Sequence, residues 1–365
     1  MAVEVVDADG HVIEPLSAWD SLPERFRPVI EIDRHGYEHV SVGGKEILVV
    51  SLGLLGTPGS VMSDPSIFKP LAETQAGGSD PVARITDMDA EGIDIAVLYP
   101  SIGLYFWALE DAAAAAAIAS AYNDWMAEYC SASPARLYGA AMLPMQDPGA
   151  SIDELRRIDR AGTFRAAFVR PNPCNGRVLS DPAYEPVWEE AEALSLAIAI
   201  HEGSSVTIPT LGDDRPFNPL VLHTASHPFE QMMACAQLIA NGVLERHPGL
   251  RVVFLEAGAT WAAFWPQRMD EQVHGFGGFC PDMRLKPSEY FARQCWISAD
   301  VDESALAAVV PVIGEERIVW GSDYPHHDAT FPGAVTELRH SLDPLPPPVQ
   351  ERIIGANAKE LYQLP

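Results

Sequence analysis

The stretch EVVDADGHVIEP (residues 4–15) carries three side chains that bind metals or transfer protons well. Asp7, Asp9 and His11 alternate where a predicted apolar strand gives way to a loop. Alternate residues of a strand point to the same side, so this spacing directs them toward one place. We expect Asp9 and His11 to bind one metal ion. Asp7, one step deeper, is expected to support them or to accept buried hydrogen bonds.

Similar residues follow later apolar runs. His201 follows LAIAI, Glu256 follows VVFL, and GSDYPHH carries Asp323, His326 and His327. Two of them have structural alternatives: His201 as a hydrogen-bonded core histidine and Asp323 as a helix cap. A carboxylate at the end of an apolar strand, however, costs several kcal/mol unless it is paired or binds a metal. Together these residues favour a divalent metal site that activates water and a nearby carboxylate that transfers protons.

Three further positions are candidates for contacts with a substrate. Arg170 in FVRPNP is expected to clamp a substrate carboxylate, with a structural ion pair as the alternative. Trp107 in SIGLYFW suggests an apolar or aromatic ligand, with lid or interface packing as the alternative. His227 is expected to reach the substrate or a metal, and His327 is expected to contact the substrate; the role of His223 is left open.

The elements that must position these residues alternate along the chain. Eight strand-like runs are separated by helical segments, and this alternation predicts a parallel sheet. The runs begin at residues 3, 93, 136, 165, 195, 250, 294 and 317. Eight such units predict a (β/α)8 TIM barrel, whose active site lies at the carboxyl ends of its strands. A doubly wound sheet is the alternative, but no GxGxxG follows the first run.

The domain prediction is a single barrel over residues 1–365 with one insertion. Residues 31–80 are rich in Gly, Pro and Ser and contain a hairpin-like stretch at residues 35–50. We expect this insertion after the first strand to lie over the barrel mouth, with a plain surface excursion as the alternative.

The composition indicates which classes of partner the protein can bind and in which cellular compartment it is expected. A formal net charge of −27, from 51 acidic and 24 basic residues, argues against binding to nucleic acid or to anionic membranes. The five cysteines are scattered and contain no CxxC pair, which is typical of reduced thiols in a cytoplasmic protein. We also expect no signal peptide, because the start of the chain lacks a basic segment followed by an apolar one.

Nearly the whole chain resembles the amidohydrolase superfamily, in the branch of the aminocarboxymuconate semialdehyde decarboxylase-like and dihydroxybenzoate decarboxylase-like enzymes. The resemblance rests on DADGH, HEG, GVLERHPGLRVVFLEAG, GSDYPH and NAKELYQL. It implies that the metal ligands are Asp9, His11, His201, Glu256 and Asp323. Asp323 is then also expected beside the metal-bound water as the acid or base, with His201 and Glu256 in supporting catalytic roles.

The resemblance leaves the reaction open. Asp9 and Glu256 stand where the decarboxylases of this branch have histidines, and a carboxylate can bridge two ions. His227 and His326 are therefore candidates for a second ion, so we expect one or two ions of Zn, Mn or Fe.

We expect a metal-dependent hydrolase acting on an amide, ester, lactone or thioester of a small molecule. The alternatives are a carboxy-lyase acting on an aromatic or unsaturated acid, a binuclear Fe/Mn enzyme that activates oxygen, and a non-enzymatic barrel with a structural metal. A homodimer, or a pairing with a related barrel subunit, is expected.

Overall fold

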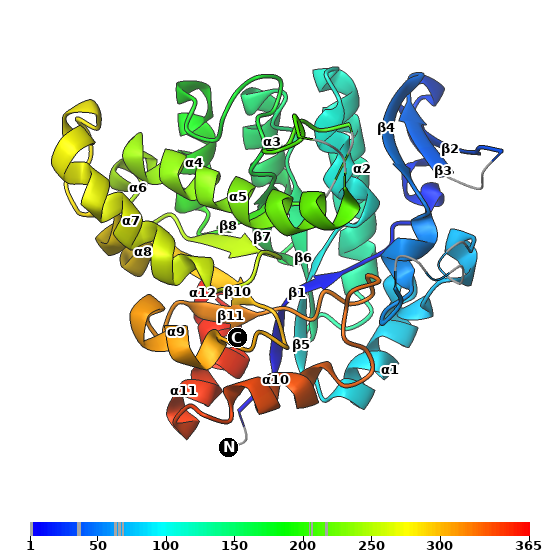
Figure 1. Ribbon diagram of the computed structural model, residues 1–365. Helices are drawn as coiled ribbons and strands as arrows, with labels where there is room; N and C mark the ends of the chain where they lie inside the picture. Colours follow the sequence, from blue (N-terminus) through cyan, green and yellow to red (C-terminus); the bar gives the residue numbers. More distant parts are fainter. Residues whose placement is uncertain are drawn as a thin grey trace.

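The computed structural model describes residues 3–34, 38–61, 64, 67, 69–203, 205, 207–215 and 218–365. Eight parallel strands form one sheet in the order β1-β5-β6-β7-β8-β9-β10-β11 (Figure 1). The strands are β1 (Val6–His11), β5 (Ile95–Tyr99), β6 (Leu137–Met142), β7 (Phe164–Val169), β8 (Ala197–His201), β9 (Val252–Leu255), β10 (Cys295–Ala299) and β11 (Ile318–Trp320).

Backbone hydrogen bonds bring the two edges of this sheet together. Asp323 N donates to Asp9 O at 3.0 Å, and His11 N donates to Tyr324 O at 2.7 Å. The loop after β11 is thereby tied to β1, and the sheet forms a nearly closed (β/α)8 barrel. This confirms the predicted fold class. Each predicted apolar run overlaps one strand of the barrel. The strands are almost entirely buried because helices cover their outer face.

The helices lie around the barrel. They are α1 (Pro81–Glu91), α2 (Ala112–Cys130), α3 (Pro148–Asp159), α4 (Glu185–Ala193), α5 (Pro219–Ala240), α6 (Val243–Arg246), α7 (Trp261–Phe276), α8 (Pro287–Gln294), α9 (Leu306–Ile313), α10 (Ala334–Leu342), α11 (Pro347–Glu351) and α12 (Asn357–Tyr362). The last two of these helices, α11 and α12, are joined by a π-helical turn, η10 (Arg352–Ala356). Short 3-10 helices are η1 (Leu16–Trp19), η2 (Glu24–Phe26), η3 (Leu52–Gly56), η5 (Leu71–Glu73), η6 (Ala76–Gly78), η7 (Ile102–Ala108), η8 (Pro182–Tyr184) and η9 (Gly277–Phe279).

Several helices begin with an Asx–Pro pair, which fixes their starting points. Asp80, Asp147 and Asn218 each accept a hydrogen bond from a backbone N–H of the first turn, and a proline follows each of them. The cap satisfies an N–H that the helix leaves unpaired, and proline has no N–H to satisfy. Helix α5 consequently begins at Pro219, and His223 and His227 lie in its first half.

A three-stranded antiparallel sheet follows η2 and lies beside the barrel (Figure 1). It consists of β2 (Pro28–Ile32), β3 (Glu38–Val42) and β4 (Lys45–Val50). Residues 35–37 of the predicted hairpin lie outside the described residues. Beyond this sheet, Ser60 N donates to His327 O at 3.0 Å, which connects the excursion to the loop after β11. The domain boundaries, with 1–365 as one domain and 31–80 as an insertion over the mouth, stay a prediction.

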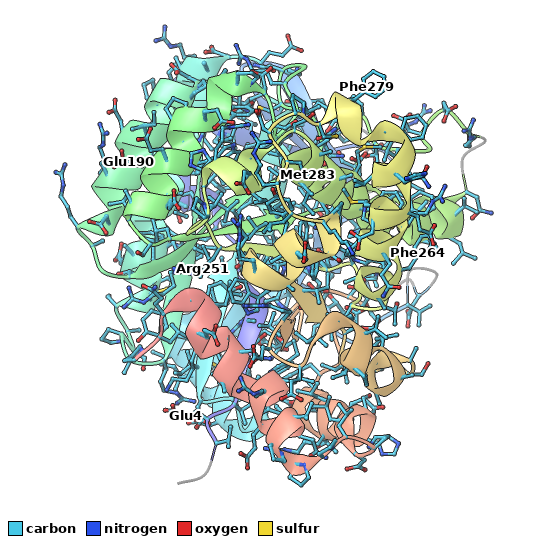
Figure 2. All side chains as sticks on the ribbon, turned by 90° about the vertical axis from the view of Figure 1, so that its left-hand side faces the viewer. Glu4, Glu190, Arg251, Phe264, Phe279 and Met283 are labelled. Carbon is cyan, nitrogen blue, oxygen red and sulfur yellow. The ribbon has the colours of Figure 1, made fainter. Side chains whose placement is uncertain are left out.

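The surface around α7 carries large apolar side chains. Phe264 is 59% exposed and Phe279 is 84% exposed, and Figure 2 shows both on this side of the molecule. Among the helices that the structure describes, none combines the length and the apolar character needed to span a bilayer.

Candidate metal centre and active site

Strand β1 ends in an irregularity that sets the direction of Asp9 and His11. Its pairing with β5 shifts register between Asp7 and Gly10. A Cβ atom at position 10 would lie 2.5 Å from Arg84 Nη2 and 2.8 Å from Asp7 Oδ2, so a larger residue here would push these two buried side chains aside. Arg84 also donates to the carbonyl oxygen of His11 at 2.8 Å. These contacts fix the strand end that presents Asp9 and His11.

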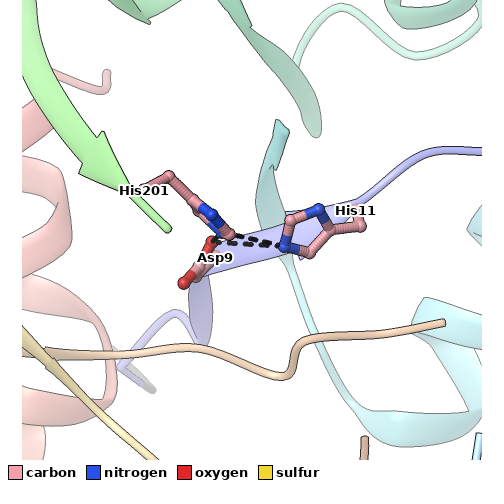
Figure 3. A group of neighbouring side chains, drawn as sticks. All are labelled: Asp9, His11 and His201. Atoms are coloured by element: carbon pink, nitrogen blue, oxygen red, sulfur yellow. Dashed lines mark hydrogen bonds and ion pairs between the residues drawn. The ribbon is translucent and has the colours of Figure 1, made fainter. Parts of the chain in front are cut away.

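Asp9, His11 and His201 form a tight group of ligand atoms (Figure 3). Asp9 Oδ1 lies 3.3 Å from His201 Nε2 and 3.7 Å from His11 Nε2. The two Nε2 atoms are 3.1 Å apart. All three side chains are buried, although they come from the ends of two different strands, β1 and β8.

The hydrogen bonds of the two imidazoles identify their tautomers. His11 Nδ1 faces the carbonyl oxygen of Pro100 at 2.8 Å, and His201 Nδ1 faces that of Glu202 at 2.6 Å. A carbonyl oxygen only accepts, so each Nδ1 carries a hydrogen, and the neutral form of each ring presents a lone pair at Nε2. Asp9 Oδ1 is buried and accepts no hydrogen bond from the described residues. Three electron-rich atoms therefore face one another, and a divalent cation fits this arrangement.

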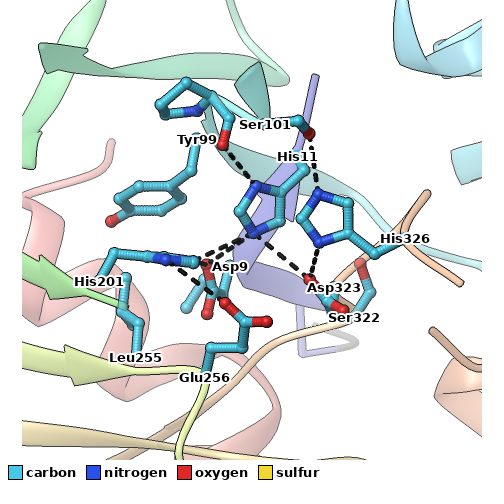
Figure 4. A network of polar contacts seen from close by, with 12 residues as sticks. Asp9, His11, Tyr99, Ser101, His201, Leu255, Glu256, Ser322, Asp323 and His326 are labelled. Atoms are coloured by element: carbon cyan, nitrogen blue, oxygen red, sulfur yellow. Dashed lines mark hydrogen bonds and ion pairs between the residues drawn. The ribbon is translucent and has the colours of Figure 1, made fainter. Parts of the chain in front are cut away.

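A second group of ligand atoms shares His11 with the first and contains Asp323 and His326 (Figure 4). Asp323 Oδ1 lies 2.7 Å from His326 Nδ1 and 3.4 Å from His11 Nε2. Ser101 Oγ donates to Val12 O at 2.7 Å and so accepts from His326 Nε2 at 2.8 Å. His326 Nδ1 then presents its lone pair to a carboxylate oxygen, a contact that needs a shared proton or a cation.

Two carboxylates of the site have left-handed backbone conformations. Glu256 has φ +50° and Asp323 has φ +52°. Residues other than glycine adopt this region rarely and at a cost of about 1 kcal/mol or more, and such residues cluster at functional sites. Asp7 helps to hold the second of these turns, because its carboxylate accepts from Ser322 N at 3.0 Å and Ser322 Oγ at 2.6 Å. Asp7 is thus a buried hydrogen-bond acceptor.

Glu256, which follows β9, lies beside His201 (Figure 4) and beside His227. Glu256 Oε2 is 3.4 Å from His201 Nδ1, and Glu256 Oε1 is 3.6 Å from His227 Nε2. Neither Glu256 nor His227 belongs to the two groups whose ligand atoms lie within 4.8 Å of one another in the described part of the chain. The structure therefore places both residues next to these groups, and their predicted roles as metal ligands stay predictions.

Burial sets the charge of the imidazoles. Burial lowers the pKa of His11 well below its usual value, and the nearby His326 and His201 lower it further. Burial likewise lowers the pKa of His326 to about 4. For His201, burial acts in the same direction, but the Asp9 carboxylate outweighs it and raises the pKa. His11 and His326 are therefore neutral at neutral pH, as metal ligands must be.

The two carboxyls with left-handed backbones differ in charge. Burial raises the pKa of Asp323 well above its usual value, and the negative charges of Glu256 and Asp328 add to this effect. Burial would also raise the pKa of Glu256, but the His201 and His227 imidazoles outweigh it and hold the pKa well below the usual range. His227 in turn has its pKa raised to about 9, because its carboxylate neighbours outweigh its burial. Neighbouring carboxyls with opposite shifts are typical of acid–base sites.

A cavity of about 520 Å³ opens beside these groups. Four imidazoles line it: His223, His227, His326 and His327. Apolar and aromatic side chains also line it, including Leu54, Leu55, Leu104 and Tyr105. A second cavity of about 400 Å³ shares His227 and Glu256 with the first and includes Asp323. The volume and the mixed lining suit a small organic ligand.

Two predicted substrate contacts lie elsewhere. Arg170 is fully buried and pairs with Glu202 at 2.9 Å, the structural ion pair that was the alternative to substrate binding. Trp107 packs inside and donates to Asn172 O at 3.1 Å. Neither residue is among those that line the two cavities in the described part of the chain. From the SIGLYFW segment, Tyr105 reaches the larger cavity instead.

Glu202 and Asp328 are site residues that the sequence analysis did not single out. Glu202 directly follows His201 at the end of β8, and this position was the available signal. Asp328 follows His327 and lines both cavities. His223, which was left open, lies four residues before His227 on α5, and the two ring centroids are 4.7 Å apart.

Comparisons of the sequence give a consistent family. A family model described as Amidohydrolase matches residues 6–364. The chain is 30% identical over 312 residues to the 2-amino-3-carboxymuconate-6-semialdehyde decarboxylase of Dictyostelium discoideum, which covers 83% of this chain and 81% of that relative. It is 29% identical over 224 residues to the gamma-resorcylate decarboxylase of Rhodococcus jostii (strain RHA1), which covers 57% of this chain and 66% of that relative.

Solved structures show the same fold. An amidohydrolase from Mycobacterium avium subsp. paratuberculosis K-10 superposes with a TM-score of 0.84 at 22% identity, covering 99% of this chain and 100% of that one. A dihydroxybenzoic acid decarboxylase from Polaromonas sp. JS666, solved with bound manganese and the inhibitor 2-nitroresorcinol, has a TM-score of 0.69 at 19% identity, covering 100% and 98%.

Proposed function

We propose a metal-dependent carboxy-lyase activity for this chain, which belongs to the amidohydrolase family. The substrate is a small aromatic or unsaturated carboxylic acid, and the products are CO₂ and the acid's carbon skeleton with hydrogen in place of the carboxylate. The relatives from Dictyostelium discoideum and Rhodococcus jostii are both named as decarboxylases. Their names support this alternative better than the hydrolysis of an amide or ester that the sequence analysis put first.

The metal is proposed to be one divalent ion, manganese or zinc, held by Asp9, His11, His201 and Asp323. His11 Nε2 belongs to both groups of ligand atoms, and its one lone pair can bind only one ion. A single ion between the two groups is therefore sufficient to explain both. Mixed imidazole and carboxylate ligands suit Zn, Mn or Fe. When bound, the ion supplies a positive charge that binds and orients the carboxylate of the substrate.

The observation that carries the proposed reaction is the contact of Asp323 Oδ1 with His326 Nδ1 at 2.7 Å, a pair that can share one proton beside the ligand groups. Burial and the neighbouring carboxylates raise the pKa of Asp323, which favours a proton on this pair. Decarboxylation needs such a proton: the carbon that bears the carboxylate accepts it, the C–C bond breaks, its electron pair returns to the carbon skeleton, and CO₂ leaves. The apolar side chains of the larger cavity exclude water and suit an aromatic ring.

A deuterium experiment tests the proposal. The purified protein is loaded with manganese and incubated in D₂O with 2,6-dihydroxybenzoate, 5-carboxyvanillate and 6-methylsalicylate in turn. We expect CO₂ release from at least one acid, and a product with one deuterium at the carbon that lost the carboxylate. Mass spectrometry measures both. The protein treated with a chelator is the control.

Hydrolysis of p-nitrophenyl acetate by the manganese-loaded protein, with no CO₂ released from any of the acids, would contradict the proposal and favour a hydrolase. In that case the product of an ester substrate in ¹⁸O-water would carry one labelled oxygen.

A further inference from the structure

Arg170 and Glu202 form a fully buried ion pair, and Arg170 contacts Gly203, which lines the larger cavity. Arg170 Nη2 donates to Glu202 Oε1 at 2.9 Å and to Gly203 O at 2.7 Å. Arg170 Nε donates to Asn172 Oδ1 at 3.1 Å. A buried ion pair adds little stability compared with apolar residues of similar size, so its presence beside a cavity calls for another explanation.

The second carboxylate oxygen of Glu202 points toward His227. Glu202 Oε2 is buried and accepts no hydrogen bond from the described residues. It lies 3.5 Å from His227 Nε2. Such an orphaned oxygen is costly unless a positive or hydrogen-donating group faces it.

His227 is held from both ends of its ring. Its Nδ1 lies 3.0 Å from Ser226 Oγ. Its Nε2 lies between two carboxylates, 3.5 Å from Glu202 Oε2 and 3.6 Å from Glu256 Oε1. Carboxylates only accept, so Nε2 carries a hydrogen, and the ring lines the larger cavity.

We propose that Arg170 and Glu202 are positioning residues that hold the His227 imidazole at the cavity wall beside Glu256, where His227 binds a polar ring substituent of the substrate. The substrate contact rests on the proposed decarboxylase function, whereas the positioning does not. Arg170 also fixes the backbone of Gly203, which lines the same cavity, so one buried guanidinium orders the carboxylate and the loop that face the ligand.

Nitrogen NMR of the histidine rings tests the positioning directly. The protein is labelled with ¹⁵N-histidine, and the His227 signals are assigned by their loss in His227→Gln. We expect Glu202→Gln to shift the His227 ring signals while those of His11 and His340 stay in place. Glu154→Gln removes another buried carboxylate, on α3, and is expected to leave His227 unchanged.

The variant Arg170→Met with Glu202→Leu covers the case in which Glu202→Gln fails to fold. It removes both charges and keeps the core filled, so we expect a folded protein in which the His227 signals still move. Unchanged His227 signals in a folded variant would overturn the proposal. So would equal shifts at every histidine, since these would mark a general structural role.

The substrate contact is tested by kinetics with an acid that the deuterium experiment identifies as a substrate. Glu202→Gln and His227→Gln are each expected to raise KM about tenfold or more, the cost of a lost hydrogen bond to a charged group, with a smaller change in kcat. Arg170→Lys keeps the positive charge beside Glu202, and it is therefore expected to raise KM less than Glu202→Gln does. A fall in kcat with KM unchanged would overturn the substrate contact. Absence of any decarboxylase activity would refute the proposed function and leave the NMR result to decide the positioning.

Discussion

At the scale of single residues, the hydrogen-bond partners of the histidines decide what the site can bind. The carbonyl oxygens of Pro100 and Glu202 accept hydrogen bonds from Nδ1 of His11 and of His201. In the neutral rings, both Nε2 lone pairs then face Asp9 Oδ1. Without a metal ion or a second proton on His201, these lone pairs and the buried carboxylate oxygen would repel one another. Asp323 joins this group through His11, and burial raises its pKa well above the usual value.

Asp323→Asn is expected to lower turnover by roughly 10²–10⁴-fold, the range for loss of a general acid or base. Asparagine keeps the shape of the side chain and tolerates the left-handed backbone at this position, φ +52°, so the fold should be retained. Steady-state kinetics and metal analysis on the same preparation measure the effect. Asp343→Asn, an exposed carboxylate paired with His340, is the control.

Loss of the metal from Asp323→Asn would show that Asp323 is chiefly a ligand. A variant that retains both its metal and full activity would refute the catalytic role.

At the scale of elements, the end of β1 determines where two proposed ligands point. The register shift between Asp7 and Gly10 lies at the step that carries Asp9. Arg84, from α1, holds the carbonyl oxygen of His11, and a Cβ at position 10 would push the Arg84 side chain aside. A helix outside the barrel therefore helps to aim a ligand inside it.

Gly10→Ala is expected to destabilise the protein by ~1–3 kcal/mol, the usual cost of an added methyl group in a close-packed site. Its Cβ would push against Arg84 and Asp7, so manganese content should fall as well. Urea unfolding and metal analysis check both effects. Gly275→Ala in α7 adds a methyl group that meets no atom within 4 Å, and it should be neutral or slightly stabilising. Equal behaviour of the two variants would contradict this account of the strand end.

At the scale of the whole molecule, the proposed ligands join parts of the chain that are far apart in sequence. Asp9 and His11 end β1, His201 ends β8, and Asp323 follows β11 next to the closure of the barrel. An ion held by all of these parts would bind the folded chain and not the unfolded one. Its binding free energy then adds to the stability of the fold.

Manganese at about 100 times its Kd is expected to contribute ~2.7 kcal/mol and to raise Tm by several degrees Celsius. Differential scanning calorimetry of the chelator-treated protein, with and without added manganese, measures this shift. Asp9→Asn should lose most of it, because Asp9 Oδ1 lies within 3.7 Å of His11 Nε2 and 3.3 Å of His201 Nε2 and supplies the negative charge of the first group. An equal shift in the variant would place the ion elsewhere.

The sequence by itself determined the barrel and the candidates for its site. Alternation of apolar runs with helical segments is a local property, and the carboxyl ends of parallel strands meet at one face, so Asp9, His11, His201 and Asp323 could be expected together. Tertiary structure alone decided which atoms meet. Arg170 turned to Glu202, 32 residues away, and Tyr105 rather than Trp107 reached the cavity. The direction of a loop side chain and the partner of a buried charge depend on packing between distant elements. The local pattern of apolar residues contains no information about this packing.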